Sequence, residues 1–573
     1  MAAISEKEYV KTDGLPADTT VQPAAGQAET YRRESSPPTS LKGKAAGNAD
    51  TESLNSDITL AAQEEGIDPA FYAKVQVLNR ALSEIGMGRY QWELFFSGGF
   101  GWFADNIWLQ AVAILMPWIG YEWIDPVHVK FATLALYAGL IVGASFWGAS
   151  CDLIGRKLAW NCTLFIGGMW GVVAGAAPNF VALCCFIAFM GFGVGGNLPV
   201  DGTMYLEFLP GSHQWVLTLL SLWWAVGQVV ASLISWGFIA RYSSDCRDYT
   251  YDANKNIIGY CSRESNMGWR YAYFTLGAMM LFLWGLRFFV LPVYESPKYL
   301  CSKGQDEKAV EVVHKVAKRN GKVVHLTVED LDRAAAPYLT PEEKAKGELH
   351  KGYTNWQLLK MSVSQGTQMK TLFKTKRLAF STTLIVLIYG IIGLAYPLFN
   401  QSLGVFLRQK QAEIAGAAPS VDDSFKSYTY QAACGIPGSM LAAFLVTVSR
   451  FGRKLAMAAF TLCSGIFLFG LTAAKNNPTV DALTSIAAFF QNAMYGVMFG
   501  YAPELFPTPV RGTGDALCAA AMRVFGLMAP IIAIYSDANK SPNGPVYASA
   551  ALYLFSGLIM LLLPVETQGR TAL

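Results

Sequence analysis

Charged residues are scarce in this chain of 573 residues. Asp, Glu, Lys and Arg make up only 15% of it, whereas 53% of its residues are hydrophobic. The formal net charge of +3 is too small to indicate a nucleic-acid partner. The sequence also has no phosphate-binding Gly-Lys loop, no metal-ligand cluster and no nucleophile triad. These absences argue against an enzyme, a bound cofactor or metal, and a pump driven by ATP.

What the sequence has instead is a series of long apolar runs. A helix needs about 20 apolar residues to cross a bilayer with roughly 30 Å of hydrocarbon. Such runs must be helical, because only a helix satisfies its own backbone polar groups in lipid. Twelve runs qualify, at residues 95–120, 131–150, 158–178, 181–204, 215–239, 271–292, 379–400, 429–448, 455–474, 482–502, 516–536 and 546–565. We therefore expect an all-α, multi-pass membrane protein with twelve transmembrane helices.

Two charged signatures occur twice, and both pairs of copies are 297 residues apart. Gly155-Arg156-Lys157 returns as Gly452-Arg453-Lys454, and Glu207, in Leu-Glu-Phe-Leu-Pro, returns as Glu504, in Pro-Glu-Leu-Phe-Pro. Two motif pairs at one offset indicate two equivalent halves, and internal repeats are usual in secondary transporters. The sequence therefore predicts two pseudo-symmetric six-helix bundles around a shared cavity.

The apolar runs and the loops between them suggest five parts. The loops on the side of the termini carry 22 basic residues against 11 on the other side, so both termini are expected in the cytosol. The first 90 residues contain no apolar run, so no cleaved signal peptide is expected, and residues 67–88 are expected to form an amphipathic cap on the membrane surface. The parts are a largely disordered cytosolic tail (1–90), the N-terminal bundle (91–292), a cytosolic central loop with short helices (293–378), the C-terminal bundle (379–566) and a cytosolic C-terminal tail (567–573).

Charged residues gather at the predicted cytosolic ends of the spans. Gly155 allows a tight turn, and Asp152 lies where it can meet the positive N-terminus of a helix. We interpret the charged set as a gate or latch that holds the two halves together in one conformation; the alternative is that the basic residues only fix topology. The predicted latch comprises Asp152, Gly155, Arg156, Lys157, Glu207, Glu295, Arg450, Gly452, Arg453, Lys454, Glu504, Arg511 and Arg523.

These motifs resemble those of the major facilitator superfamily. The Asp152-to-Lys157 turn, Glu295-Ser296-Pro297 and the terminal Glu566-Thr567-x-Gly569-Arg570 are similar to the sugar porter branch. The stretches 98–105, 191–210 and 503–526 look closer to synaptic vesicle 2-related proteins and organic cation/anion transporters. The resemblance implies the twelve-helix fold of that superfamily. Span seven lacks the sugar-porter glutamine cluster, which argues against a hexose substrate.

Ionisable residues at membrane depth are few, and such residues are usually functional or paired. We assign proton coupling to Asp105 in span one and Asp201 in span four, because an acid in an alternately opening cavity can take up and release a proton. A structural role remains open for both acids, and Asp201 can instead pair with Arg156. Arg523 can offset Asp201 or Glu207, or bind an anionic substrate. Arg287 is expected to snorkel to the cytosolic surface.

Polar and aromatic residues near the predicted midplane complete a candidate substrate site. Such pockets combine apolar walls with a few placed polar groups. The candidates are Trp102, Asn106, Trp223, Trp224, Gln228, Tyr389, Tyr396, Gln491, Asn492 and Tyr495. Two cysteines, Cys246 and Cys261, share the loop between spans five and six on the outer side, where they either form a disulfide or remain free thiols.

The sequence thus favours a secondary active transporter of a small organic solute that works by alternating access, with proton symport as the first mechanism. The alternatives are inorganic phosphate:proton symport, organic-cation uniport or antiport, and a non-transporting nutrient sensor. The expected partners are the solute, a proton and the lipid bilayer. We expect a monomer in the plasma membrane, with a vacuolar or other internal membrane as the alternative.

The predicted topology can be tested with epitope tags placed before Met1 and after Leu573. Both tags should be accessible to antibody only after the cytosolic face is exposed, because twelve crossings return the chain to its starting side. Detection of the two tags on opposite sides would contradict the even number of spans.

Overall fold

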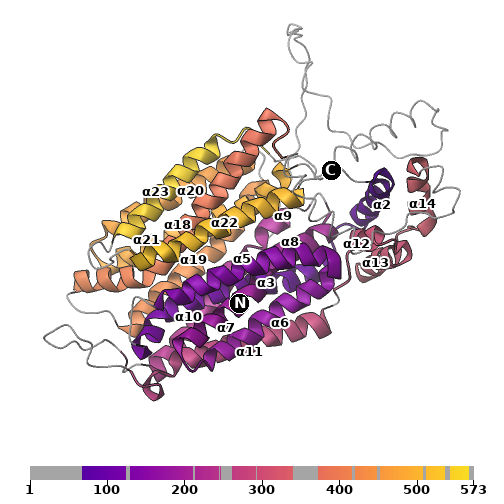
Figure 1. The fold of residues 1–573 in the computed structure, drawn as a ribbon. Coiled ribbons are helices and arrows are strands. Elements are labelled where there is room, and N and C mark those ends of the chain that lie inside the picture. The colour runs from indigo at the N-terminus through magenta and orange to yellow at the C-terminus, as the bar shows by residue number, and fades with distance from the viewer. Residues whose placement is uncertain are drawn as a thin grey trace, which may run out of the picture. The chain divides into compact units, whose positions relative to one another are not determined.

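The computed structural model describes residues 68–123, 129–210, 213, 215–243, 246, 261–291, 293–339, 372–415, 420–447, 452–506, 511–535 and 543–566. These residues belong to one compact unit of the chain. The described residues form helices and connecting turns, with no strand among them (Figure 1). The prediction of an all-α protein is therefore confirmed for this part of the chain.

Each half of the chain supplies six membrane-length segments, as the apolar runs predict. The first half has α3 (Arg89–Glu122), α5 (Phe131–Ile154), α6 (Arg156–Gly175), α7 and α8 (Phe180–Val194 and Asn197–Phe208), α9 and α10 (Trp215–Leu219 and Leu222–Tyr242), and α11 with its π-helical end η3 (Gly268–Gly285 and Leu286–Val290). The second half has α18 (Lys376–Ala415), α19 (Val421–Thr447), α20 (Gly452–Thr472), α21 (Asn477–Leu505), α22 (Arg511–Tyr535) and α23 (Gly544–Leu561). Within the described ranges, ten helical segments are long and apolar enough to cross a membrane. Helix α3 and the broken pair α7–α8 complete the predicted twelve.

Two segments differ from the expected spans. Span four is interrupted, because α7 ends at Val194 and α8 begins at Asn197 after two glycines. Helix α18 continues to Ala415, well past the predicted end of span seven at residue 400. The side-chain amide of Gln411 in this extension donates to the Ser427 hydroxyl of α19 at 3.2 Å, which ties the extension to its neighbour.

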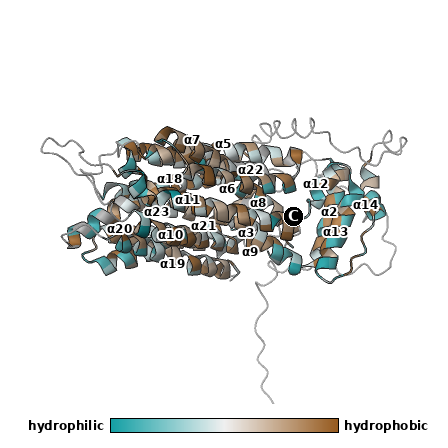
Figure 2. Ribbon diagram, turned by 90° about the horizontal axis from the view of Figure 1, so that it is seen from below, coloured by the Kyte–Doolittle hydropathy of each residue, from teal (hydrophilic) through white to brown (hydrophobic). Residues whose placement is uncertain are grey.

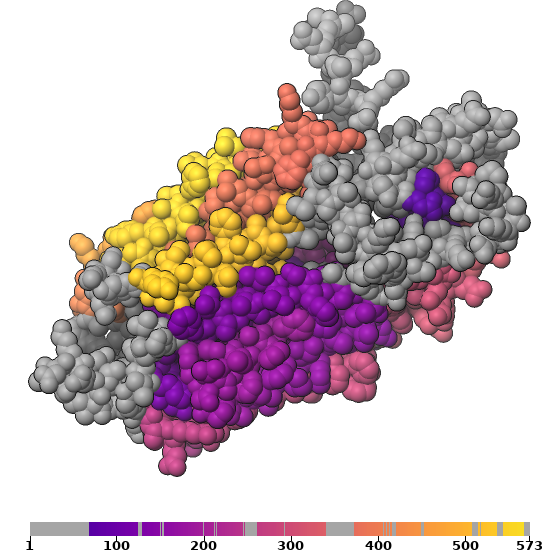
Figure 3. All heavy atoms as spheres, viewed as in Figure 1, coloured from indigo at the N-terminus to yellow at the C-terminus, as the bar shows by residue number. Residues whose placement is uncertain are grey.

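The two bundles meet along two seams, one between α5 and α22 and the other between α10 and α19. Figure 3 shows the indigo-to-purple first half against the orange-to-yellow second half along the first of these seams. The helices that line the interface between the bundles are therefore α3, α5 and α10 from the first half and α18, α19, α21 and α22 from the second.

Short polar helices form a cap at one end of the bundles (Figure 2). The cap combines α2 (Pro69–Ile85) from the N-terminal segment with α12 (Pro297–Ser302), α13 (Asp306–Arg319), α14 (Val328–Ala335) and η4 (Ala336–Tyr338) from the central loop. Leu78 and Ile85 on α2 are fully buried. The predicted helix is thus present, and its apolar face is covered by the loop helices.

A buried lysine holds the cap together. Lys74 of α2 has no exposed surface, and its ammonium group pairs with Asp306 of α13 and, at 3.7 Å, with Asp332 of α14. The cap is also joined to the start of α3, where the Arg319 guanidinium donates to both carboxylate oxygens of Glu93 at 2.8 and 2.9 Å. Ionic contacts thus connect the N-terminal segment, the central loop and the first span.

The Lys74→Ala substitution should loosen the cap, because it leaves two carboxylates of a buried cluster without their cation. Removing one partner of a buried pair costs about 3 kcal/mol, which corresponds to roughly a hundredfold faster amide exchange in α13 and α14. Hydrogen–deuterium exchange followed by mass spectrometry measures this. Lys315→Ala is the matched control, because Lys315 pairs with Glu311 on the exposed face of α13. Equal exchange in the two variants would contradict the clamp.

Candidate functional site

The repeated Gly-Arg-Lys turn of the first half forms a capped helix start. Gly155 joins α5 to α6 with φ of 100°, a conformation that favours glycine. The carboxylate of Glu295 accepts hydrogen bonds from the backbone N–H groups of Arg156 and Lys157, at 3.0 and 3.2 Å. A carboxylate at this position satisfies free donors of the helix N-terminus and interacts favourably with its dipole.

The second half repeats this arrangement atom for atom. Gly452 has φ of 61°, and the Glu566 carboxylate accepts from the N–H groups of Arg453 and Lys454 at 2.8 and 3.2 Å. A Cβ atom on Gly452 would lie 2.5 Å from a Glu566 oxygen, so the glycine is required by space as well as by its backbone conformation. The halves are therefore equivalent in chemistry as well as in motif spacing.

The arginines of these turns pair with the two repeated glutamates. Arg156 of α6 pairs with Glu207 of α8, and Arg453 of α20 pairs with Glu504 of α21. These pairs brace helices of the same half, so they do not support the interpretation of these residues as a latch between halves. The side chains of Asp152, Arg450 and Arg511, which belong to the same predicted latch, lie outside the described residues.

Asp105 lies in the middle of α3 and is 4% exposed. Its carboxylate accepts a hydrogen bond at 3.1 Å from the side-chain amide of Asn197, the first residue of α8. The same amide nitrogen lies 3.3 Å from the carbonyl oxygen of Gly101, one turn earlier on α3. The break in span four thus presents Asn197 to the acid, a role that the sequence did not indicate.

Arg523 reaches this region from the second half. Its guanidinium, carried by α22, donates to the carbonyl oxygen of Gly195 in the break of span four at 3.1 Å. Arg523 and Asp105 thus both contact residues at the break in span four, and no direct ion pair joins them among the described residues. Of the alternatives that the sequence left open for Arg523, neither pairing with Asp201 nor pairing with Glu207 is found.

Asp201 has a different environment from Asp105. It forms an ion pair with Arg287 at 2.9 Å, and neither side chain has exposed surface. Arg287 also donates to the carbonyl oxygen of Trp160 at 2.9 Å and lies over the Trp160 ring. Arg287 is 1% exposed, so the expectation that it snorkels to the surface is wrong, and Asp201 takes Arg287 as its partner in place of Arg156. The pairing favours a structural role for Asp201 over the predicted proton coupling.

A cluster of aromatic rings spans the interface between the halves. Trp102 of α3 and Trp224 of α10 stack with ring centroids 4.7 Å apart. Phe499 of α21 lies against Trp224 at 5.0 Å and against Tyr389 of α18 at 5.8 Å, while Tyr495 lies 5.9 Å from Trp224. The structure therefore brings four predicted substrate residues together around Phe499, which sequence analysis missed because a single Phe in an apolar span carries no signal.

A second group of predicted residues forms a polar bridge between the halves. The amide nitrogen of Gln228 lies 2.8 Å from the Asn106 side-chain oxygen and 2.7 Å from the Tyr396 hydroxyl, and the Tyr396 ring contacts Tyr495. A small cavity lies beside this bridge, between α3, α5, α10 and α18. Its polar lining includes Gln110, Gln228, Tyr396, Asn400 and Gln401.

Three predicted substrate residues are placed differently. Trp223 packs against Phe96 and Phe100 at 5.6 and 6.1 Å, away from the Trp102–Trp224 stack. The amide of Asn492 donates to the Ala488 carbonyl of its own helix at 3.1 Å. Gln491 is 1% exposed, and its amide nitrogen has no hydrogen-bond partner in the described part of the chain. Gln491 and Trp223, whose indole N–H is also unpaired within the described residues, therefore each keep a free donor.

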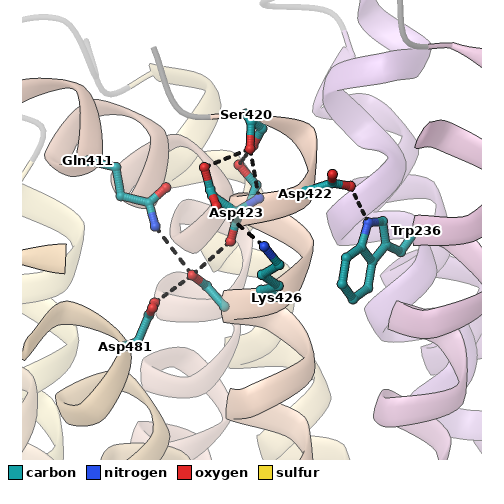
Figure 4. Close-up of polar contacts among 9 residues, drawn as sticks. Trp236, Gln411, Ser420, Asp422, Asp423, Lys426 and Asp481 are labelled. Atoms are coloured by element: carbon teal, nitrogen blue, oxygen red, sulfur yellow. Dashed lines mark hydrogen bonds and ion pairs between the residues drawn. The ribbon is translucent and has the colours of Figure 1, made fainter. Parts of the chain in front are cut away.

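The halves also meet near the start of α19, the end that we predict to face outward (Figure 4). The indole N–H of Trp236 on α10 donates to Asp422 of α19 at 2.7 Å. Lys130, just before α5, donates to the carbonyl oxygen of Ala533 on α22. The structure joins Cys246 and Cys261 in a disulfide, with 5.8 Å between their Cα atoms. Both seams are thus closed at this end.

Comparison with known proteins agrees with this architecture. The profile of the family described as Sugar (and other) transporter matches residues 70–572. A siderochrome iron transporter of the major facilitator superfamily from Ceriporiopsis subvermispora is 43% identical over 510 residues, which are 88% of this chain and 93% of the relative. Synaptic vesicle 2-related protein of Rattus norvegicus is 27% identical over 509 residues, which are 86% and 81% of the two chains.

Among solved structures, the fold is similar to that of the proton:xylose symporter XylE from E. coli, bound to 6-bromo-6-deoxy-D-glucose. The TM-score is 0.60 at 17% identity, over 84% of this chain and 98% of that one. At this identity the likeness shows the fold alone. Members of the matching family are transporters and not enzymes, and the chain belongs to the sugar porter-like branch of the major facilitator superfamily.

Proposed function

We propose that this chain is a secondary active transporter that moves a small organic solute together with a proton by alternating access. The observation that carries the proposal is Asp105, a buried carboxylate that binds Asn197 at the break in span four, where Arg523 of the second half binds the Gly195 carbonyl. The proton:xylose symporter with the same fold supports symport as a mechanism available to this architecture.

The position of Asp105 links its protonation to the relative movement of the halves. An ionised carboxylate in a water-poor interior is costly unless a cation compensates it. Arg523 brings a positive charge to the same break in span four from the other bundle, so an electrostatic attraction across the interface exists only while Asp105 is ionised. Uptake of a proton removes the attraction and lowers the cost of separating the halves on that side.

The aromatic cluster and the polar bridge give the solute contacts with both halves. Trp102 and Trp224 come from the first bundle, whereas Phe499 and Tyr396 come from the second. A solute held between them is bound most tightly when the bundles close around it, which is the requirement for alternating access. The same arrangement makes the empty and the loaded protein differ in their preferred conformation.

Alternative substrates should be included in the transport assays. Phosphate porters of this superfamily resemble this chain in span one but have an acid where this chain has Asn197, so phosphate ranks second. The Ceriporiopsis relative is described as a siderochrome iron transporter, so ferric chelates should also be tested as substrates. Organic-cation transport and nutrient sensing remain lower alternatives. A plasma-membrane location, cytosolic termini and a monomeric state are part of the same proposal.

The Asp105→Asn variant should lose accumulation driven by a pH gradient, by at least about tenfold, while it still exchanges labelled solute between equilibrated compartments. The amide keeps the shape of the side chain but cannot carry a proton. Uptake into proteoliposomes with and without an inward proton gradient measures both activities. Asp423→Asn, at an exposed acid that contacts Ser420, is the control and should behave like the wild type. Gradient-driven accumulation by the Asp105 variant would rule out its coupling role.

The Asp201–Arg287 pair allows a second prediction. Asp201→Asn should lower thermal stability by about 3–5 kcal/mol, because it leaves the buried Arg287 charge uncompensated. The double variant Asp201→Asn/Arg287→Met should recover most of that loss and keep pH-gradient coupling. Thermal unfolding in detergent and proteoliposome uptake measure the two effects. A stable double variant without coupling would instead show that Asp201 carries the proton.

A further inference from the structure

The charges near the centre of the bundles sum to zero when Asp105 is ionised. Spans α5, α10, α18, α19 and α21 carry no charged residue within their predicted membrane segments. Asp201, the other acid that acts on Asp105, is itself neutralised by Arg287. Asp515 lies eight residues before Arg523 on α22, about 12 Å along the helix axis and thus beyond ion-pair distance of it. Asp105 and Arg523 are therefore the two charges to be balanced at this site.

Arg523 has hydrogen-bonding capacity left over. A guanidinium has five N–H donors, and the hydrogen bond that Arg523 makes within the described residues uses one, to the Gly195 carbonyl. No carboxylate lies within ion-pair distance of it there, although half-buried cations usually acquire such a partner. A planar cation with a free fork of donors is suited to a carboxylate or sulfonate group.

Two further donors point to a ligand that accepts hydrogen bonds. The indole nitrogens of Trp102 and Trp224 are buried and have no partner among the described residues, and an indole N–H can only donate. Trp102 lies one turn before Asp105 on α3, so these donors belong to the same region as the acid. One unpaired acceptor, the Asn197 amide oxygen, also lies nearby, so the site offers mainly donors and one acceptor.

We propose that the transported solute is an organic monoanion, held by Arg523 and carried together with the proton on Asp105. The inference rests on the proton symport proposed above and names its substrate class. Protonation of Asp105 changes the site from neutral to a net charge of +1, and the anion returns it to zero. A neutral solute would leave the Arg523 charge uncompensated in the closed cavity, and a cation would add a second positive charge.

The charge balance fixes what crosses the membrane in one cycle. One proton and one monoanion enter together, and both leave on the other side, where Asp105 again becomes the counter-charge of Arg523. No net charge moves, so transport should respond to a pH gradient but not to membrane potential. Symport of a proton with a neutral solute moves one positive charge and responds to both.

Two sets of matched, membrane-impermeant probes test the charge preference. One set is gluconate, glucose and glucosamine; the other pairs benzenesulfonate with the cation trimethylphenylammonium. Wild-type protein in proteoliposomes should accumulate at least one monoanion under an inward proton gradient, and not its neutral or cationic counterpart. Clamping the potential with potassium and valinomycin should leave the initial rate unchanged.

Variants of the two charged residues separate binding from coupling. Arg523→Gln should abolish binding of the anion, whereas Arg523→Lys should keep part of it. Wild-type affinity should fall by up to about tenfold per pH unit as Asp105 loses its proton. Asp105→Asn should bind the anion with an affinity independent of pH, because its site keeps the net charge of +1. Equilibrium binding of the radiolabelled anion measures these affinities.

The outcomes distinguish the two proposals. If glucose or either cation accumulates under the proton gradient and no anion does, the proposal of a monoanion substrate is wrong, whereas the proposal of proton symport is kept. Anion uptake that follows the membrane potential, or anion binding unaffected by Arg523→Gln, would overturn the proposed charge balance. If no probe accumulates above the level of protein-free vesicles, both proposals fail.

Discussion

The cost of placing a charge in a water-poor interior is the constraint on which this structure depends. Asp201 and Arg287 show one response to it, a fully buried ion pair made between two helices of the same bundle. Glu295 and Glu566 show another, in which a carboxylate is compensated by the N–H groups at the start of a helix. Each of these solutions keeps its charges within one half, so none of these contacts has to break when the halves move relative to each other.

Asp105 and Arg523 differ from these residues, because within the described residues neither has an opposite charge paired with it in its own half. This difference is the reason to assign them a function. They come from different bundles and both lie beside the break in span four, with no direct ion pair between them in the described part of the chain. The break in span four makes this meeting geometrically available, because it exposes the Gly195 carbonyl to Arg523 and the Asn197 amide to Asp105. A continuous helix would use the Gly195 carbonyl for its own hydrogen bond, whereas the Asn197 contact is made by a side chain. The interruption of α7–α8 is thus part of the site.

The cap illustrates how sequence reasoning succeeds locally and fails at the next level. Asp68 accepts from the Ala70 N–H and the proline at position 69 begins the helix, so the start of α2 follows from its sequence. What covers its apolar face does not follow, since lipid and the helices of a distant loop are equally apolar partners. The site shows the same limit. Trp102, Trp224 and Tyr495 were predicted and do meet, but Trp223 turns to the other side of α10 although it is the neighbour of Trp224.

The sequence by itself determined the twelve spans, the two equivalent halves and the charged turns, because length, hydropathy and motif spacing are properties of a linear chain. Only the tertiary structure decided which charges are partners. Arg287 and Arg523 are both arginines in apolar spans, yet Arg287 is neutralised within its own bundle and Arg523 reaches across to the Gly195 carbonyl of the other bundle. Pairing depends on how helices hundreds of residues apart rotate and approach each other, and that geometry is set by packing between helices and not by any one of them.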